Sequence, residues 1–384
     1  MNAPRSTSAW TTLRSLVPAS GSALDENALA QVFPVVNRFA GVVQDPIHHA
    51  EGDVHIHTMM VLRCLVDEPR FQALSEREQT IVFIAALLHD VAKPDTTTID
   101  DDGRVHARGH SAKGAIQARS LLWELGLDSE TREAICGLVL FHQVPFFLIN
   151  HDDKAAERKA LRMAESCRLD LLELVAWADA AGRRCHDQAG LLERVALFGH
   201  LAAEFGVAST PFAFANDHTR FRYFRDERRT RHDVAYDDTA TTVTVMVGLP
   251  ATGKDRFVAQ HRGLADVISL DDLRAEHGLE HGSGQARVVS LAMEQLKTSL
   301  RQRRAVVWNA TNLVRELRGK IIDVADTYRA RVRIVVVEAS PATIATRNRA
   351  REAPVPATAI ARMLHRWEPP HRGDAHQLDV IVSE

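Results

Sequence analysis

The chain has 384 residues, a formal net charge of −3 and four cysteines. This length exceeds what one hydrophobic core usually supports, so we expect two domains. The small net charge argues against a protein that coats polyanions with its whole surface, and nucleic-acid contacts would have to come from local arginine clusters. The cysteines lack CxxC spacing, and neither a signal-peptide run nor the roughly 18 apolar residues of a membrane span occurs. We therefore expect a cytoplasmic protein that does not act at a membrane.

The first half of the chain carries apolar residues at helical spacing from about residue 26 to 205. The pattern is clearest in QTIVFIAALLHDVAK (79–93), AKGAIQARSLLWELG (112–126) and LDLLELVAWADAAG (169–182). Apolar residues three and four positions apart lie on one helix face, which packs against neighbouring helices. This half predicts an all-α domain.

From residue 241 the pattern changes to short runs rich in β-branched residues, TTVTVMV, ADVIS, AVVW and VRIVVVEA. A helix-like segment follows each run, which predicts an α/β domain with a parallel sheet covered by helices. The intervening stretch 214–238 is rich in charge and aromatic residues and has little periodicity. We expect one domain over residues 1–225 and the second over residues 226–384.

The helical half contains adjacent His89 and Asp90 at the end of a predicted helix. Imidazole and carboxylate together suit divalent zinc, iron, manganese, nickel or cobalt, and adjacent residues at a helix end can point two ligands into one cavity. A capped helix end with a solvated histidine is the alternative for an isolated pair.

Five stretches surround this pair in a fixed order. They are HHAEGDVHIHTMMVL (48–62), ALLHDVAKPDTT (86–97), HARGHSAKGA (106–115), FHQVPFFL (141–148) and WADAAGR (177–183). Together they resemble the HD phosphohydrolase superfamily, especially the HD domains attached to tRNA nucleotidyltransferases. The resemblance implies metal-assisted phosphoester hydrolysis, in which a cation polarises phosphoryl oxygens and lowers the pKa of a bound water.

The resemblance also implies roles for single residues. The metal ligands it implies are His57, His89, Asp90 and Asp179, with His110 and His142 at positions that give some members a second metal. Lys93 matches a position that can neutralise a phosphate, or it is an exposed lysine at a helix end. His49, Glu51 and His55 remain open between partners that orient a ligand and residues of purely local structure.

The second half contains GLPATGKD at residues 248–255, in which Gly248, Gly253 and Lys254 fit G-x-x-x-x-G-K-[ST]. A predicted strand precedes this loop and a predicted helix follows it, which is the context that the motif requires. In such a loop backbone N–H groups surround the β-phosphate and the lysine reaches the β and γ oxygens. We expect ATP or another nucleoside triphosphate to bind here with Mg²⁺.

Asp271 follows the second predicted strand and Arg274 lies one helical turn later. Ligands of α/β proteins bind beyond the carboxyl ends of the strands, where Asp271 can accept a proton and Arg274 can hold a phosphate. An ordinary acidic helix start is the alternative. Arg347, Arg349 and Arg351 precede a proline-containing break, and the first and last of them are expected on one helix face. They form either a lid over the triphosphate or a solvated basic helix.

These motifs resemble the 5′-OH polynucleotide kinase family, and with the HD-like half in front they resemble the bacterial HD-Pnk family over nearly the whole chain. The resemblance implies that Asp271 is the general base, that Arg274 holds the phosphate 3′ to the acceptor nucleoside, and that Arg347 and Arg351 are lid arginines. It also implies a 2′,3′-phosphoesterase in the HD domain.

The resulting prediction is a bifunctional enzyme that heals RNA or DNA ends. A functional link to a ligase follows, because a ligase needs a 3′-OH and a 5′-phosphate. A nucleotide hydrolase fused to a small-molecule or mononucleotide kinase is one alternative, and an ATP-binding regulatory module is another. The sequence leaves the oligomeric state open.

Two residues depart from the usual kinase pattern. Asp255 replaces the Ser or Thr of the loop, and Asn309 in WNATNL replaces an Asp after the next strand. Either the carboxylate has moved from the strand to the loop and still serves the magnesium ion, or Asp255 only stabilises the N-terminus of the following helix.

Overall fold

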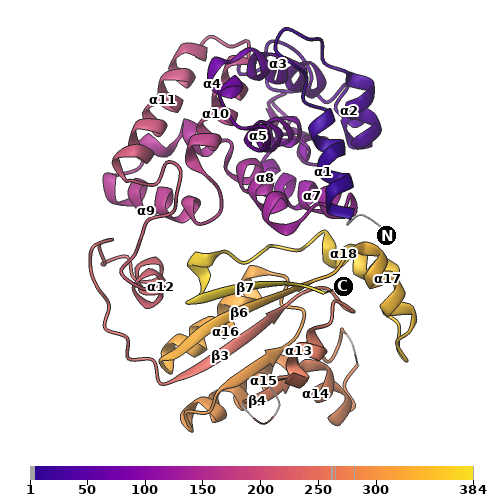
Figure 1. The fold of residues 1–384 in the computed structure, drawn as a ribbon, viewed down its shortest axis with the longest axis vertical. Coiled ribbons are helices and arrows are strands. Elements are labelled where there is room, and N and C mark those ends of the chain that lie inside the picture. The colour runs from indigo at the N-terminus through magenta and orange to yellow at the C-terminus, as the bar shows by residue number, and fades with distance from the viewer. Residues whose placement is uncertain (1–4, 261–262, 264, 281, 384) are drawn as a thin grey trace. The chain divides into compact units, whose positions relative to one another are not determined.

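The computed structural model describes residues 5–260, 263, 265–280 and 282–383. The chain forms two compact units, Met1–Phe212 and Ala213–Glu384 (Figure 1). None of the helices in these described ranges combines the length and the apolar character needed to cross a membrane.

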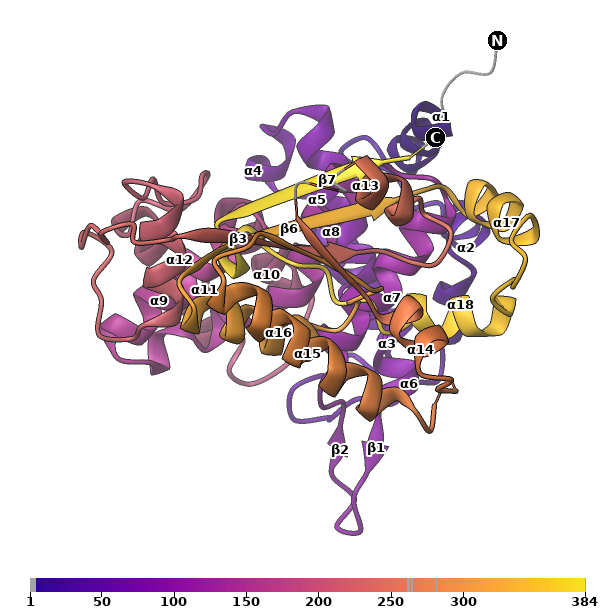
Figure 2. The same cartoon turned by 90° about the horizontal axis from the view of Figure 1, so that it is seen from below.

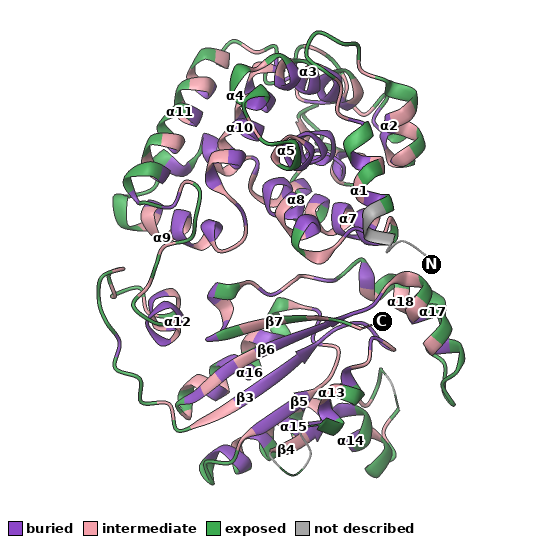
Figure 3. Cartoon of the chain, viewed as in Figure 1, coloured by how far each residue is buried: buried purple, intermediate pink, exposed green. Residues whose placement is uncertain are grey.

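The first unit is built around helix α5, Glu76–Leu88. Every side chain of α5 from Thr80 to Leu88 is buried (Figure 3). A helix that is apolar on all sides must be covered on all sides, and α3 (Val54–Asp67), α8 (Ser129–Phe141) and α10 (Leu169–Ala181) pack against it. The all-α prediction for this half is confirmed.

The remaining elements of the first unit surround this centre. They are α1 (Arg5–Ser15), α2 (Glu26–Val32), η1 (Pro34–Arg38), α4 (Pro69–Gln72), α6 (Lys93–Thr96), α7 (His110–Glu124), η2 (Val144–Phe146), η3 (Leu148–Asn150), α9 (Asp153–Ala164) and α11 (Gln188–Glu204). Two short strands that the sequence pattern did not predict, β1 (Thr98–Ile99) and β2 (Val105–His106), form a hairpin that extends away from these helices (Figure 2).

Two of the central helices end where the histidines begin. Helix α5 starts with Ser75 and Glu78 in a capping box and ends at Leu88, so that His89 is its C-cap. Helix α8 starts at the cap residue Asp128 and ends at Phe141, so that His142 is its C-cap. Because α5 and α8 pack together, their ends bring two imidazole rings to one place.

The second unit contains a five-stranded parallel sheet in the order β4-β5-β3-β6-β7. The strands are β3 (Thr241–Val247), β4 (Asp266–Ser269), β5 (Val306–Asn309), β6 (Ala330–Glu338) and β7 (Gln377–Val382). This arrangement confirms the predicted α/β domain with a parallel sheet. The edge strand β7 was not predicted, because its side chains are half-buried or exposed and give no continuous apolar run.

Helices cover both faces of this sheet (Figure 2). Met246, Val307 and Val335 form a buried cluster on one face with Val258 of α13 (Lys254–Gln260). On the other side of the sheet, α15 (Gln285–Arg301) and α16 (Arg315–Thr327) lie next to each other and contact the strands. The parallel strands thereby bring the loops after β3, β4 and β5 to one edge.

The two units divide after Phe212, whereas the sequence pattern placed the limit between residues 225 and 226. The difference is the helix α12, Asp217–Arg225, which belongs to the second unit. Its Arg220 donates from Nη2 to the backbone oxygen of His376 at 2.8 Å, and its Arg222 donates to Asp326 at 2.7 Å. These bonds join a polar segment without clear periodicity to the sheet domain.

Candidate active sites

In the first unit, six residues that the sequence analysis singled out as metal ligands form one buried cluster. Asp90 lies at its centre, with its Oδ2 3.1 Å from His89 Nε2 and its Oδ1 3.3 Å from His110 Nε2. His142 Nε2 lies 4.0 Å from Asp90 Oδ1, and His57 Nε2 lies 3.9 Å from Asp90 Oδ2. The sixth residue, Asp179 of α10, places its Oδ1 3.1 Å from His57 Nε2. None of the six is more than 6% exposed.

The histidine rings of this cluster are oriented by the backbone. His89 and His142 each donate Nδ1–H at 2.7 Å to the carbonyl oxygen three residues earlier, Ala86 and Val139 respectively. The last carbonyls of a helix have no partner within the helix, so C-cap histidines can satisfy them. His110 makes the same bond to the residue three positions before it, also at 2.7 Å. These bonds turn Nε2 toward Asp90 and make it the nitrogen that carries the lone pair whenever the ring is neutral.

The cluster has the properties of a cation site. His57 Nε2, His89 Nε2 and both carboxylate oxygens of Asp90 are buried and form no well-aligned hydrogen bond with the described residues. Two overlapping groups of three candidate ligands, His57 with His89 and Asp90, and Asp90 with His110 and His142, have their ligand atoms within 4.8 Å of one another. Buried acceptors without donors are costly, and a divalent cation that prefers nitrogen and oxygen ligands would satisfy them.

Most protonation states of the cluster also suit a cation. Burial lowers the pKa of His142 to about 3 and also lowers the pKa of His110. Burial opposes the ionisation of Asp90 and Asp179, but neighbouring cationic groups, His89 for the first and Arg183 for the second, hold their pKa values well below the usual range. Ionised carboxylates and neutral imidazoles are the forms that bind metals.

Two cationic side chains border the cluster. Lys93 Nζ lies 2.7 Å from Asp90 Oδ2 and donates to Gln44 Oε1 at 2.6 Å. Arg183 makes a bidentate bond to Asp179 at 2.9 and 2.6 Å. Lys93 is therefore buried, contrary to its reading as an exposed lysine at a helix end. The sequence analysis missed Gln44, because a single glutamine in a loop carries no pattern.

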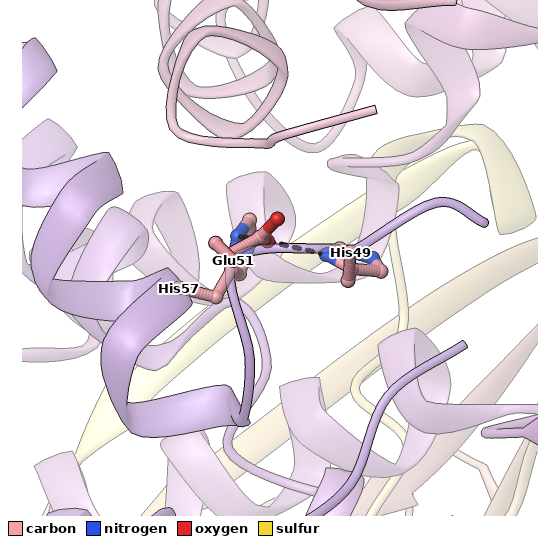
Figure 4. A group of neighbouring side chains, drawn as sticks. All are labelled: His49, Glu51 and His57. Carbon is pink, nitrogen blue, oxygen red and sulfur yellow. Dashed lines mark hydrogen bonds and ion pairs between the residues drawn. The ribbon is translucent and has the colours of Figure 1, made fainter. Parts of the chain in front are cut away.

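A second group lies beside His57 (Figure 4). The Glu51 side chain has no exposure, and its Oε1 lies 2.8 Å from both His49 Nδ1 and His57 Nδ1. Its Oε2 accepts the backbone N–H of Arg184 at 2.8 Å. Although burial opposes its ionisation, the bond from His49 holds the pKa of Glu51 below its usual range. Glu51 thus lies where it can orient His57, whereas His55 bonds to Glu26 at 3.2 Å outside the cluster.

In the second unit, residues 248–253 form a loop between β3 and α13. Gly248 has φ +152°, and a Cβ there would lie 2.3 Å from the backbone oxygen of Val337. Gly253 has φ +101°, a conformation that side chains disfavour. No acceptor in the described ranges takes the backbone N–H groups of residues 251–254. Such unpaired donors at a loop before a helix suit a phosphate group.

Lys254 is folded onto the loop that carries it. Its Nζ donates to the backbone oxygens of Gly248 at 2.9 Å and Leu249 at 2.7 Å. Burial lowers the pKa of Lys254 to about 8, and the carboxylates of Asp255 and Asp271 partly offset this effect. The lysine is therefore held at the loop, near both carboxylates.

The two departures from the kinase pattern are in direct contact. Asn309 is the last residue of β5, which lies next to β3 in the sheet. Its Nδ2 donates to Asp255 Oδ1 at 2.9 Å. Residues 54 positions apart in the chain thus form one polar pair at the phosphate loop.

The acceptor residues also contact each other. In α14 (Leu270–Glu276), Arg274 bonds to the carboxylate of Asp271 and donates to Gln285 Oε1 at 2.8 Å. The Asp271 side chain is 78% exposed and the Arg274 side chain is 11% exposed. The Nε–H of Arg274 is buried and has no acceptor among the described residues. This buried donor suits a phosphate oxygen.

The arginines at the end of α17 (Pro341–Arg349) lie near the loop. Arg347 donates from Nη1 to Ser383 Oγ at 2.8 Å and to the backbone oxygen of Thr252 at 3.4 Å. Because the helix ends at Arg349, Arg347 and Arg351 do not share one helix face, which corrects that expectation. Arg351 lies beyond the helix end, and its charge contributes to lowering the pKa of Lys254.

The family models that match the chain agree with this division. A family model described as HD domain matches residues 54–182, and a model described as AAA domain matches residues 243–370. The crystal structure of a "putative kinase" from Chloroflexus aurantiacus covers 38% of this chain and 86% of its own, with 16% identity and a TM-score of 0.33.

Curated relatives match part of the chain. The Multifunctional CCA protein of Hahella chejuensis is 30% identical over 176 residues, 43% of this chain and 37% of the relative. The CC-adding tRNA nucleotidyltransferase of Thermus thermophilus is 32% identical over 157 residues, 40% of this chain and 32% of the relative. The chain thus spans about a third of the length of these relatives. This chain carries an N-terminal HD domain and a C-terminal kinase-like P-loop domain.

Proposed function

We propose that the protein heals broken nucleic-acid ends with two active sites. The HD domain removes phosphate from the 2′ or 3′ side of a strand, and the P-loop domain transfers the γ-phosphate of ATP to a 5′-OH. The observation that carries the proposal is the contact between Asp271 and Arg274, beyond the carboxyl end of a parallel strand. A carboxylate beside a guanidinium fits a hydroxyl acceptor that has a phosphate next to it.

In the HD domain, the buried cluster would hold one or two divalent cations, such as manganese, nickel, cobalt, zinc or iron. A cation bound there supplies polarisation of phosphoryl oxygens and a water of lowered pKa. The protein's own part is to fix the ligands and to bind the substrate. Lys93 has three N–H donors, of which one bonds to Gln44 and one can face Asp90 in the ion pair at 2.7 Å. The third can bind a phosphate oxygen.

In the kinase domain, the loop N–H groups, Lys254, Arg347 and Arg351 would bind the triphosphate. ATP would supply the phosphoryl group, and the Mg²⁺ bound with it would neutralise part of the charge on the phosphates. The bond between the 5′ oxygen and the γ-phosphorus forms while the β,γ-bridge breaks, and the hydroxyl proton passes to Asp271. Arg274 holds Asp271 in place and binds the phosphate 3′ to the acceptor nucleoside through its unpaired Nε–H.

The names of the relatives favour RNA as the substrate of this protein. The printed name of one relative refers to CCA and that of another to tRNA. Contacts to phosphates carry no base sequence. We therefore infer little preference for particular bases.

The proposal is tested by label transfer from γ-labelled ATP with Mg²⁺. Equal concentrations of a 5′-OH oligonucleotide and of a 3′-mononucleotide are offered in separate reactions. The proposal predicts strong transfer to the oligonucleotide. Transfer to the mononucleotide alone would favour a small-molecule kinase, and binding of ATP with no transfer to either acceptor would favour a regulatory module.

A further inference from the structure

We propose that Asp255 and Asn309 form an exchanged pair, in which the carboxylate that serves the nucleotide-bound magnesium has moved from the strand end to the phosphate loop. The inference rests on the proposed nucleotide binding at this loop. Its basis in the structure is the hydrogen bond from Asn309 Nδ2 to Asp255 Oδ1.

The exchange keeps the chemistry of the pair and reverses its direction. With Ser or Thr in the loop and Asp at the strand end, the hydroxyl can donate to the carboxylate. Here the amide of Asn309 donates and the carboxylate of Asp255 accepts. Both arrangements contain one donor, one negative charge and further oxygen atoms.

The atoms that remain suit magnesium. Asp255 accepts the bond from Asn309 through Oδ1. Asp255 is an exposed residue that follows Lys254 in the chain. The bond from Asn309 uses its amide nitrogen and not its amide oxygen. Magnesium takes oxygen ligands, often through water, and one or two carboxylates beside the substrate phosphates commonly serve it. A carboxylate oxygen and an amide oxygen at the loop meet this requirement.

The pairing gives a physical reason for the two departures to occur together in this chain. An aspartate at position 309 would place a second carboxylate within 2.9 Å of Asp255, in place of the present hydrogen bond. Two carboxylates at this distance repel each other. A serine at position 255 next to Asn309 would leave no negative charge in the pair. Each single change is therefore unfavourable, and the two together restore a donor and a carboxylate.

The test measures nucleotide affinity with magnesium and with EDTA, using a fluorescent ADP analogue. The proteins are the wild type, Asp255→Ser, Asn309→Asp, the double variant, and Asp272→Asn as a control that removes a nearby exposed carboxylate. We expect Asp255→Ser to lose most of the affinity gain that magnesium gives, about tenfold or more. The double variant should regain most of it, and the affinity in EDTA should change little.

Two results would overturn the exchange. If the double variant shows the sum of the single losses, the two positions act separately. If Asp255→Ser lowers the affinity equally with magnesium and with EDTA, its carboxylate only stabilises the loop and the start of α13. Because no acceptor hydroxyl takes part in this measurement, its result is independent of whether the protein phosphorylates a polynucleotide.

Discussion

The Nε2 atoms of His110 and His142 lie 3.3 Å apart, while each ring donates its Nδ1–H to a backbone carbonyl. Two neutral imidazoles in this arrangement turn two lone pairs toward each other. Burial lowers the pKa of both rings, which disfavours a proton between them. A divalent cation would turn this repulsion into two favourable contacts.

We therefore predict that divalent cations stabilise the helical unit. After chelation, Mn²⁺ should raise its melting temperature, with a gain of about 2.7 kcal/mol at a concentration 100 times the dissociation constant. His142→Gln should need at least about tenfold more cation, whereas the exposed His151→Gln should match the wild type. A melting curve unaffected by manganese, nickel, cobalt, zinc and iron would contradict the cation site.

Gln44 should matter for hydrolysis without binding the cation. Its Oε1 accepts from Lys93 Nζ at 2.6 Å, so Gln44→Leu leaves the lysine held by Asp90 alone. We expect the rate of phosphate release to fall about tenfold, an estimate from one lost charge-assisted bond. The cation concentration at half-maximal stabilisation should stay the same. Gln117→Leu, on an exposed bond to Asp95, is the control.

The P-loop domain should lose stability in acid through His376. This ring accepts the backbone N–H of Val332 at 3.0 Å and bonds to His218 at 3.0 Å, and burial lowers its pKa to about 4. Its folded pKa lies below the ordinary value of 6.5, so the unfolded chain takes up a proton first as the pH falls. The contribution of this ring to the free energy of unfolding is fully present above pH 6.5. It declines toward pH 4, by up to about 3 kcal/mol.

This pH effect can be measured by chemical unfolding at several pH values. In His376→Gln the decline between pH 6.5 and 4 should be smaller, since the titrating ring is gone. The exposed His365→Gln should keep the decline of the wild type. An equal decline in all three proteins would show that other groups cause it.

Asp271 and Arg274 should affect different kinetic steps. Asp271→Asn would remove the proposed proton acceptor and should lower kcat by about 10²-fold or more, with little change in affinity for the oligonucleotide. Arg274→Ala should raise the KM for the oligonucleotide and leave ATP binding unchanged. Near-normal turnover of Asp271→Asn would remove this residue from the base role, and Asp272→Asn serves as its control.

Sequence reasoning succeeded where residues follow a period. The strand Thr241–Val247 has the limits of its β-branched run, and α5 follows its apolar pattern almost to His89. It failed where long-range contacts decide to which site or which domain a residue belongs. Gln44 lies in a loop, and only its contact with Lys93 shows that it belongs to the site. Arg220 belongs to the second unit because it bonds to residues 375 and 376. Neither contact produces a pattern in the local sequence from which it could be predicted.

The proposed function requires two independent sites in one chain, which act on opposite ends of a strand. The most direct measurement is mass spectrometry of an RNA oligonucleotide with a 5′-OH and a 3′-phosphate, incubated with ATP, Mg²⁺ and Mn²⁺. The wild type should convert it to a 5′-phosphate and a 3′-OH. Asp90→Ala should add the 5′-phosphate and keep the 3′-phosphate, and Asp271→Asn should do the reverse. Loss of both conversions in either folded variant, or a wild type that performs neither, would contradict the account.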